Sequence, residues 1–243
     1  MSHRRCAQLV AWGTAWLSGA VAFDSVLDAM GSRERHRPGT GFAATELHPV
    51  GTVLTEWRRA GAVHLTLVLP VPGDVRGLPR SPEFQQLALA GGQAVVATGC
   101  ALTCVLGPAT PSSAGREVWW HQASDTGAVA DFVDLADAEH ELKEAIRVTA
   151  SELAQRGTSS WAEVPPALSE ARRAGERLNL PDSHPARAVR VVAQAERMSA
   201  RLALADADGG SELTSTGAQE RAAALAPLRI AVRRALLAGY NAR

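Results

Sequence analysis

Two β-rich runs separated by only two residues constrain the fold of this chain more than any other feature of its sequence. The runs QAVVAT (93–98) and ALTCVLG (101–107) flank Gly99-Cys100. A connection that short joins antiparallel neighbours, because parallel strands need a crossover of about a dozen residues or more. The runs AVHLTLVLP (62–70) and REVWWHQA (116–123) have the composition of two further strands. The sequence therefore predicts a small antiparallel sheet rather than a doubly wound parallel one.

Helical patterns surround and then follow these strands. Helices are predicted at about 47–59 and 83–90, and then at 131–156, 164–178, 184–206 and 216–240. The polar run GSRERHRPGTG (31–41) is interpreted as a connector. The predicted fold class is α+β. Residues 1–130 form the α+β region, with amino-terminal helices and the antiparallel sheet, and residues 131–243 form an all-helical region packed onto it.

The adjacent pair Trp119-Trp120 bears on how the sheet is covered. Neighbours on a strand point to opposite faces, and each indole has about 150–250 Å² of surface to bury. We therefore expect both faces of the sheet to be covered, by helices from either region or by a partner subunit. This favours one integrated fold over two independent domains.

The amino terminus has two interpretations. Apolar residues recur at helical steps: Leu9, Trp12, Trp16, Ala20, Phe23, Leu27 and Met30. This stripe predicts one or two amphipathic helices, broken near Ser18-Gly19 and restarted around Asp24. The alternative is a secretory signal cleaved after Ala22, but a signal peptide has no reason to stay in phase with the mature protein. Nothing approaches the roughly 18 apolar residues of a transmembrane helix, so no membrane partner is expected.

Charge and cysteine usage narrow the partners and the compartment. The chain has 25 basic and 25 acidic residues, and this zero net charge argues against a general nucleic-acid binder. Its three cysteines (Cys6, Cys100 and Cys104) show no metal-ligand spacing, and an odd count suggests free thiols in a reducing compartment. We interpret all three as packing residues, although Cys100 and Cys104 could in principle pair. The expected location is cytoplasmic.

The loop from Pro70 to Pro79 is the first candidate site, since the common catalytic motifs are absent. It carries Asp74 and Arg76 together with Gly73 and Gly77. Prolines stiffen such a loop, glycines admit close backbone approach, and the charged pair could bind a polar or anionic ligand. The alternative is a rigid loop in which the aspartate caps a turn and pairs with the arginine.

A resemblance arises at this same loop. The run LVLPVPGDVRGLP, preceded by WLSGAVAFDSVLDAM and followed by FQQLALAGGQAVV, resembles a family of cytoplasmic actinobacterial proteins with no assigned activity. The similarity covers most of the chain, including its helical second half. It implies the same compartment and draws attention to the loop, but it carries over no catalytic residues.

Three weaker signals lie elsewhere. Asp137, His140 and Glu144 share one helical face that could donate metal ligands, although acids near a helix start are favoured by the macrodipole alone. His64 and His121 lie on predicted strands and could approach each other across the sheet. The last helix is mildly basic and could touch an acidic partner, but a solvated face explains it as well.

The sequence thus favours a non-enzymatic cytoplasmic protein that works by binding another protein or a second copy of itself. Its tryptophan-rich sheet and amphipathic helices could present the interface. The competing hypothesis is a small-molecule-binding protein or enzyme with its site at the Pro70–Pro79 loop. Neither hypothesis includes a cofactor or a metal.

Overall fold

The computed structural model describes residues 4–31, 34–43, 49–106, 116–124, 133–155, 178–207 and 215–243. The chain divides into two compact units. The first holds residues 1–132, 179–184 and 243, and the second holds residues 133–178 and 185–242. The α+β fold class with a mostly helical carboxy-terminal region is confirmed. Integration of the two regions into one fold stays a prediction.

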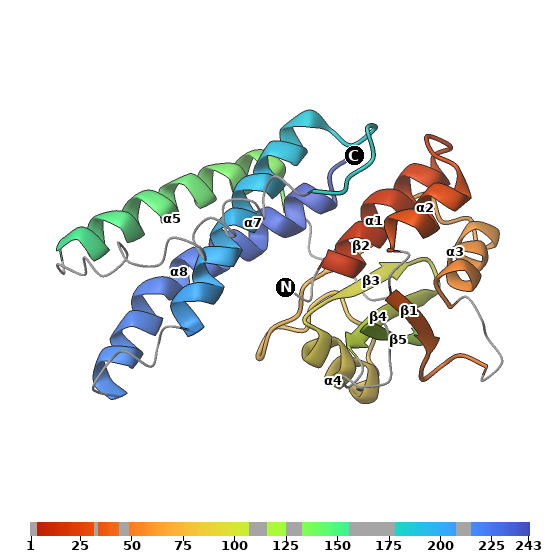
Figure 1. Ribbon diagram of the computed structural model, residues 1–243, viewed down its shortest axis with the longest axis horizontal. Coiled ribbons are helices and arrows are strands. Elements are labelled where there is room, and N and C mark those ends of the chain that lie inside the picture. Colours follow the sequence, from red (N-terminus) through yellow and green to blue (C-terminus); the bar gives the residue numbers. More distant parts are fainter. Residues whose placement is uncertain are drawn as a thin grey trace. The chain divides into compact units, whose positions relative to one another are not determined.

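The first unit contains a five-stranded sheet and its flanking helices (Figure 1). The helices are α1 (Arg4–Leu17), α2 (Phe23–Ala29), α3 (Pro49–Arg59) and α4 (Pro82–Gly91). The strands are β1 (Glu34–Pro38), β2 (Thr66–Val68), β3 (Ala94–Ala97), β4 (Cys100–Leu106) and β5 (Arg116–Ser124). Their spatial order is β1-β5-β4-β3-β2.

The amino-terminal stripe forms two helices, as its periodicity predicts. α1 ends at Leu17, Gly19 adopts a positive φ of 82°, and α2 begins at Phe23. Leu9 and Val26 are fully buried. The apolar face of these helices therefore belongs to the core of the first unit.

The sheet is mixed, which corrects the prediction of a purely antiparallel one. The tight connection at Gly99 joins β3 to β4 as an antiparallel hairpin, and β2 and β5 also pair antiparallel to their inner neighbours. Residues 31–41 were expected to be a connector, but Glu34–Pro38 forms β1, parallel to β5 at the edge of the sheet. The sequence pattern did not predict β1 as a strand because its residues are mostly charged. Edge strands tolerate charged side chains that central strands exclude.

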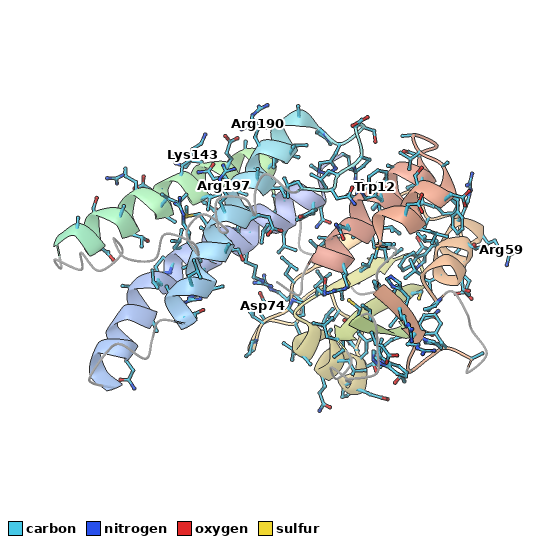
Figure 2. All side chains as sticks on the ribbon, in the orientation of Figure 1. Trp12, Arg59, Asp74, Lys143, Arg190 and Arg197 are labelled. Carbon is cyan, nitrogen blue, oxygen red and sulfur yellow. The ribbon has the colours of Figure 1, made fainter. Side chains whose placement is uncertain are left out.

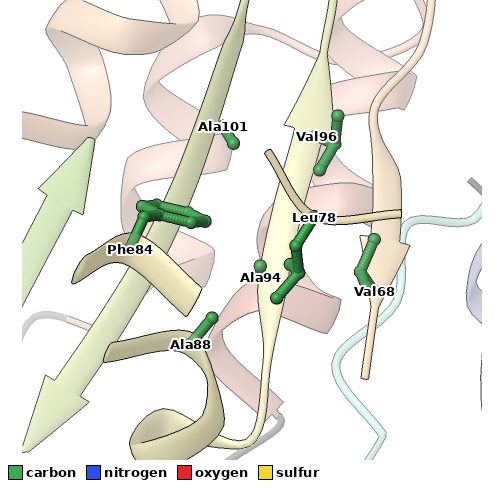
Figure 3. Close-up of a cluster of buried hydrophobic side chains, with 7 residues drawn as sticks. All are labelled: Val68, Leu78, Phe84, Ala88, Ala94, Val96 and Ala101. Carbon is green, nitrogen blue, oxygen red and sulfur yellow. The ribbon is translucent and has the colours of Figure 1, made fainter. Parts of the chain in front are cut away.

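Helices cover the two faces of the sheet unequally. α1 and α3 pack on one face, and α4 packs on the other (Figure 1). Phe84 and Ala88 of α4 lie in a cluster of buried side chains with residues of the loop and of β2, β3 and β4 (Figure 3). The expectation that both faces are covered holds over β2–β4, whereas Trp119 keeps 37% of its surface exposed within this chain, so its cover by a partner subunit stays a prediction.

The second unit is built from α5 (Leu135–Gln155), α7 (Ala186–Ala207) and α8 (Ser215–Tyr240). These helices confirm the predictions at 131–156, 184–206 and 216–240. The helix predicted at 164–178 lies, except for its last residue, outside the described residues. α8 packs against both α5 and α7, and its last six helical residues are all buried. Within the described part of the chain, no helix is long and apolar enough to cross a membrane.

Candidate functional site

Side chains of three neighbouring strands form a surface that we call the Trp119 face. It consists of Arg35 and Arg37 of β1, Glu117 and Trp119 of β5, and Val105 of β4. The strand register aligns Trp119 with Arg37 on one side and with Val105 on the other. Strand alternation places these residues on the same side of the sheet as Ala101, which packs against α4.

The indole of Trp119 is open to solvent because α4 does not extend over it. α4 packs against the β2–β4 cluster and reaches β5 at Ala123, four residues beyond Trp119. The next residue, Trp120, points to the other face and is fully buried. Trp119 therefore presents a large apolar side chain of which 37% is exposed to solvent, so the packing of the core buries it only in part.

The charge beside this indole is positive. Arg37 donates from Nη2 to Glu117 Oε1 at 3.3 Å, and the side chain of Arg37 is still 47% exposed. Arg35 is exposed, and among the described residues no ion pair holds its guanidinium. Two guanidinium groups against one carboxylate leave the Trp119 face with one net positive charge. A guanidinium can bind a carboxylate bidentately and can stack on an aromatic ring.

The two arginines are held in place from the opposite side of the sheet. Trp120 Nε1 donates to His36 Nδ1 at 2.8 Å, and the two rings stack with an interplanar angle of 18°. Because an indole N–H can only donate, His36 Nδ1 must accept and carries no proton. This half-buried contact fastens β1 to β5. It thereby fixes Arg35 and Arg37, the alternate residues of β1, on the Trp119 face.

His121 lies farther along β5 in a polar cluster of its own. Its Nδ1 accepts from the Thr40 backbone N–H at 3.0 Å, and Thr40 Oγ1 donates to Glu83 Oε1 at 3.5 Å. Burial lowers the pKa of His121, while the charge of Glu83 acts in the opposite direction. The expected approach of His64 to His121 is wrong, because His64 precedes β2 and both β3 and β4 separate β2 from β5.

The Pro70–Pro79 loop is a preformed turn whose charged groups bind each other. Val71 and Asp74 form a β-bridge around Gly73, whose φ of 86° requires glycine or a strained residue. Arg76 donates to the two carboxylate oxygens of Asp74 at 2.9 and 3.1 Å. Gly77 also has a positive φ, of 84°. Asp74 is labelled on this loop in Figure 2. Ligand binding by Asp74, Arg76, Gly73 and Gly77 stays a prediction.

The exposed ion pair of this loop can be tested against its buried neighbour. We expect Asp74→Ala combined with Arg76→Ala to lower the free energy of unfolding by no more than about 1 kcal/mol, because the Arg76 side chain is 67% exposed. Leu78→Ala, in the same loop, should cost about 2–4 kcal/mol, since Leu78 is 5% exposed and packs under α4. Urea unfolding followed by circular dichroism measures both.

The same variants decide whether the loop binds anions. If it does, inorganic phosphate should raise the melting temperature of the wild-type protein and leave the double variant unchanged. Equal shifts in both proteins would remove Asp74 and Arg76 as ligand residues. A loss of stability comparable to that of Leu78→Ala would instead show that the pair holds the turn.

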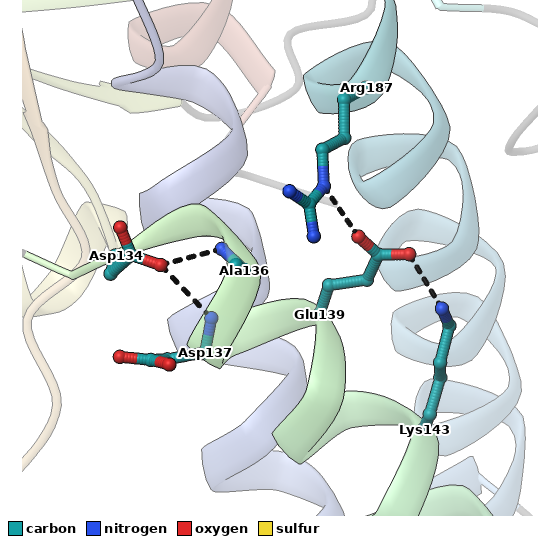
Figure 4. Close-up of polar contacts among 6 residues, drawn as sticks. All are labelled: Asp134, Ala136, Asp137, Glu139, Lys143 and Arg187. Carbon is teal, nitrogen blue, oxygen red and sulfur yellow. Dashed lines mark hydrogen bonds and ion pairs between the residues drawn. The ribbon is translucent and has the colours of Figure 1, made fainter.

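The acidic start of α5 serves helix capping and ion pairing. Asp134 Oδ1 accepts from the backbone N–H groups of Ala136 and Asp137 at 2.8 and 3.1 Å (Figure 4). Glu139 accepts from Lys143 and from Arg187 of α7, and these hydrogen bonds lower the pKa of its carboxyl group. Asp137, His140 and Glu144 are all exposed, and Glu144 pairs with Arg147. Within the described ranges, no three His, Cys, Asp or Glu side chains are placed to hold a metal.

Two arginines of the mildly basic last helix are engaged within the second unit. Arg229 pairs with Asp206 of α7, and Arg234 donates to Glu141 of α5 at 2.7 Å. Both pairs tie α8 to its neighbours. The charge on this helix therefore has a structural use that does not depend on a partner.

Two family models match nearly the whole chain. They are described as Rv1486c-like protein, N-terminal domain, over residues 6–130, and Rv1486c-like protein, C-terminal domain, over residues 136–237. Uncharacterized protein Rv1486c of Mycobacterium tuberculosis is 31% identical over 274 residues, which cover 95% of this chain and 94% of the relative. Uncharacterized protein ML1804 of Mycobacterium leprae is 28% identical over 291 residues, covering 96% and 95%. No solved structure matches the chain.

These matches confirm the resemblance to an uncharacterised actinobacterial family.

The sequence did not single out the Trp119 face, although part of its signal was present. In ERHRP, a histidine lies between two arginines at strand alternation, and in VWW a tryptophan must take the same face as those arginines if the two segments pair.

Proposed function

The chain belongs to the Rv1486c-like protein family, and we propose that it is a non-enzymatic binding protein that docks another protein on its Trp119 face. The observation that carries this proposal is the open indole of Trp119 beside two exposed arginines. Tryptophan and arginine are the residues most enriched among those that dominate interface energies. We place the activity in the cytoplasm, because all three cysteines are free thiols, the state expected in a reducing compartment.

The charge of the face selects the partner that we propose. One carboxylate, Glu117, stands against Arg35 and Arg37, so a segment that offers glutamate or aspartate around an apolar side chain complements the face. A second copy of this chain complements it less well. In a twofold contact the same patch meets itself, so the excess guanidinium charges of the two copies would repel each other. The proposed occupant is therefore an acidic segment of a different protein.

A defined peptide pair tests this proposal directly. The probe is a fluorescently labelled peptide with glutamates on both sides of one phenylalanine, and its counterpart carries lysines in place of the glutamates. We expect the acidic peptide to bind and the basic one to fail, with anisotropy as the readout and weaker binding at raised salt. Arg35→Glu should reduce the affinity about tenfold or more, since it reverses a charge at the centre of recognition.

A matched charge reversal provides the control. Arg59 is exposed at the end of α3, on the covered face of the sheet (Figure 2), so Arg59→Glu changes the net charge equally but leaves the Trp119 face intact. Equal loss of binding in both variants would mean that the net charge of the protein alone explains the effect, and this would overturn the proposal. A dimer in native mass spectrometry that Arg35→Glu dissociates would replace the foreign partner with a second copy.

A further inference from the structure

Two cysteines that are far apart in the sequence meet in the core of the first unit. Cys6 lies in the first turn of α1 and Cys104 lies on β4, and their side chains are 0% and 3% exposed. One side-chain amide holds both residues. Gln93 Oε1 accepts from the Cys6 backbone N–H at 2.9 Å, and Gln93 Nε2 donates to Cys104 Sγ at 3.3 Å. The two cysteines are thus joined through the two ends of a single amide group.

From this juxtaposition, we infer that Cys6 and Cys104 are a modification site. Oxidation by a peroxide joins them in a disulfide that fastens α1 to β4. Their shared contact with the Gln93 amide gives the two cysteines the close approach that a disulfide requires. Gln93, which is 1% exposed, keeps the backbone of one cysteine and the sulfur of the other at a fixed separation.

The third cysteine, Cys100, cannot take the place of Cys6 as the partner of Cys104. Cys100 and Cys104 both lie on β4, four residues apart, so their Cα atoms are about 13 Å apart along the strand. Cysteines whose Cα atoms are more than about 7 Å apart cannot be bridged without moving the backbone. The pairing of Cys100 with Cys104 that the sequence allowed in principle is therefore wrong.

The reaction consumes one molecule of peroxide and two thiols. Hydrogen peroxide transfers an oxygen to the sulfur of one cysteine, giving a sulfenic acid and one water. The second sulfur then attacks the first, the S–S bond forms, and the sulfenic hydroxyl leaves as a second water after taking the thiol proton. Two electrons pass from the thiols to the peroxide, and a dithiol reductant reverses the change.

Burial makes this oxidation slow. The pKa of the Cys6 thiol is raised by burial first, and then by its hydrogen bond to Cys104 and by the charge of Cys104. The thiolate is the reactive species, so the pair stays reduced until the first turn of α1 opens. Once formed, the disulfide closes a loop of about 100 residues, and a cross-link restricts the unfolded chain more strongly as the loop that it closes becomes longer.

The experiment oxidises a Cys100→Ala variant, which retains only Cys6 and Cys104, with hydrogen peroxide. We expect the intact mass to fall by two hydrogen atoms, and the peptides containing Cys6 and Cys104 to appear cross-linked. The melting temperature should rise by about 10 °C and return to its starting value with dithiothreitol. The wild-type protein should give the same intramolecular product and still offer one free thiol to a maleimide.

Three outcomes would overturn the inference. The first is that both thiols remain free after full exposure to peroxide, and the second is that they advance separately to sulfinic acids. The third is a cross-link between two chains instead of within one. Unfolding in urea before oxidation shows whether the thiols are merely inaccessible: a link that forms only from the unfolded chain also counts against a site built by the fold.

Discussion

Replacing Trp120 with alanine is expected to lower the free energy of unfolding of the first unit by about 3–5 kcal/mol. Its indole is fully buried in the centre of β5, so the substitution leaves a large cavity. It also removes the 2.8 Å hydrogen bond from Trp120 Nε1 to His36 Nδ1, which fastens β1 to β5. Urea unfolding followed by far-ultraviolet circular dichroism measures the loss.

The adjacent residue provides the control for this prediction. Trp119→Ala should cost about 1 kcal/mol, because Trp119 is already 37% exposed and lies outside the α4 cluster. Trp120→Phe should give an intermediate loss, since it retains most of the ring volume but cannot donate to His36. Equal losses for Trp119→Ala and Trp120→Ala would make both indoles core residues and would remove the basis of the proposed interface.

The two tryptophans also show how far the sequence could predict the site. Strand alternation alone places Trp119 and Trp120 on opposite faces, and this expectation is confirmed by their burial. Which of the two stays open depends on how far α4 extends over the sheet. That extent is set by the loop that delivers α4 and by the packing of Phe84 and Ala88, which are tertiary features without a local signal.

Contacts between segments that are far apart in the sequence could not be predicted from it, for the same reason. β1 has no apolar alternation of its own, and only its pairing with β5 makes it a strand. Cys6 and Cys104 meet because α1 crosses the sheet, and no spacing rule reports such a contact. Short-range features were predicted more reliably. The Gly99 hairpin and the break after α1 each depend on a glycine that adopts a positive φ.

The second large effect is expected at Gly91, where α4 comes closest to the sheet. A Cβ atom at this position would lie 2.4 Å from the carbonyl oxygen of Cys104. That oxygen belongs to the backbone of β4, an inner strand paired on both sides, so it cannot move aside. Gly91→Val should therefore lift the end of α4 from the sheet and lower the free energy of unfolding by about 3 kcal/mol.

A neighbouring position on the same helix separates this collision from helix propensity. Ala90 is exposed, so Ala90→Val introduces the same β-branched side chain in the same turn without meeting β4, and it should cost less than about 1 kcal/mol. Gly91→Val should in addition bind the dye ANS, because lifting α4 uncovers the cluster around Phe84. Equal effects of the two substitutions would mean that α4 can shift without losing its core. The boundary between the covered sheet and the Trp119 face would then not be fixed by the Gly91 contact.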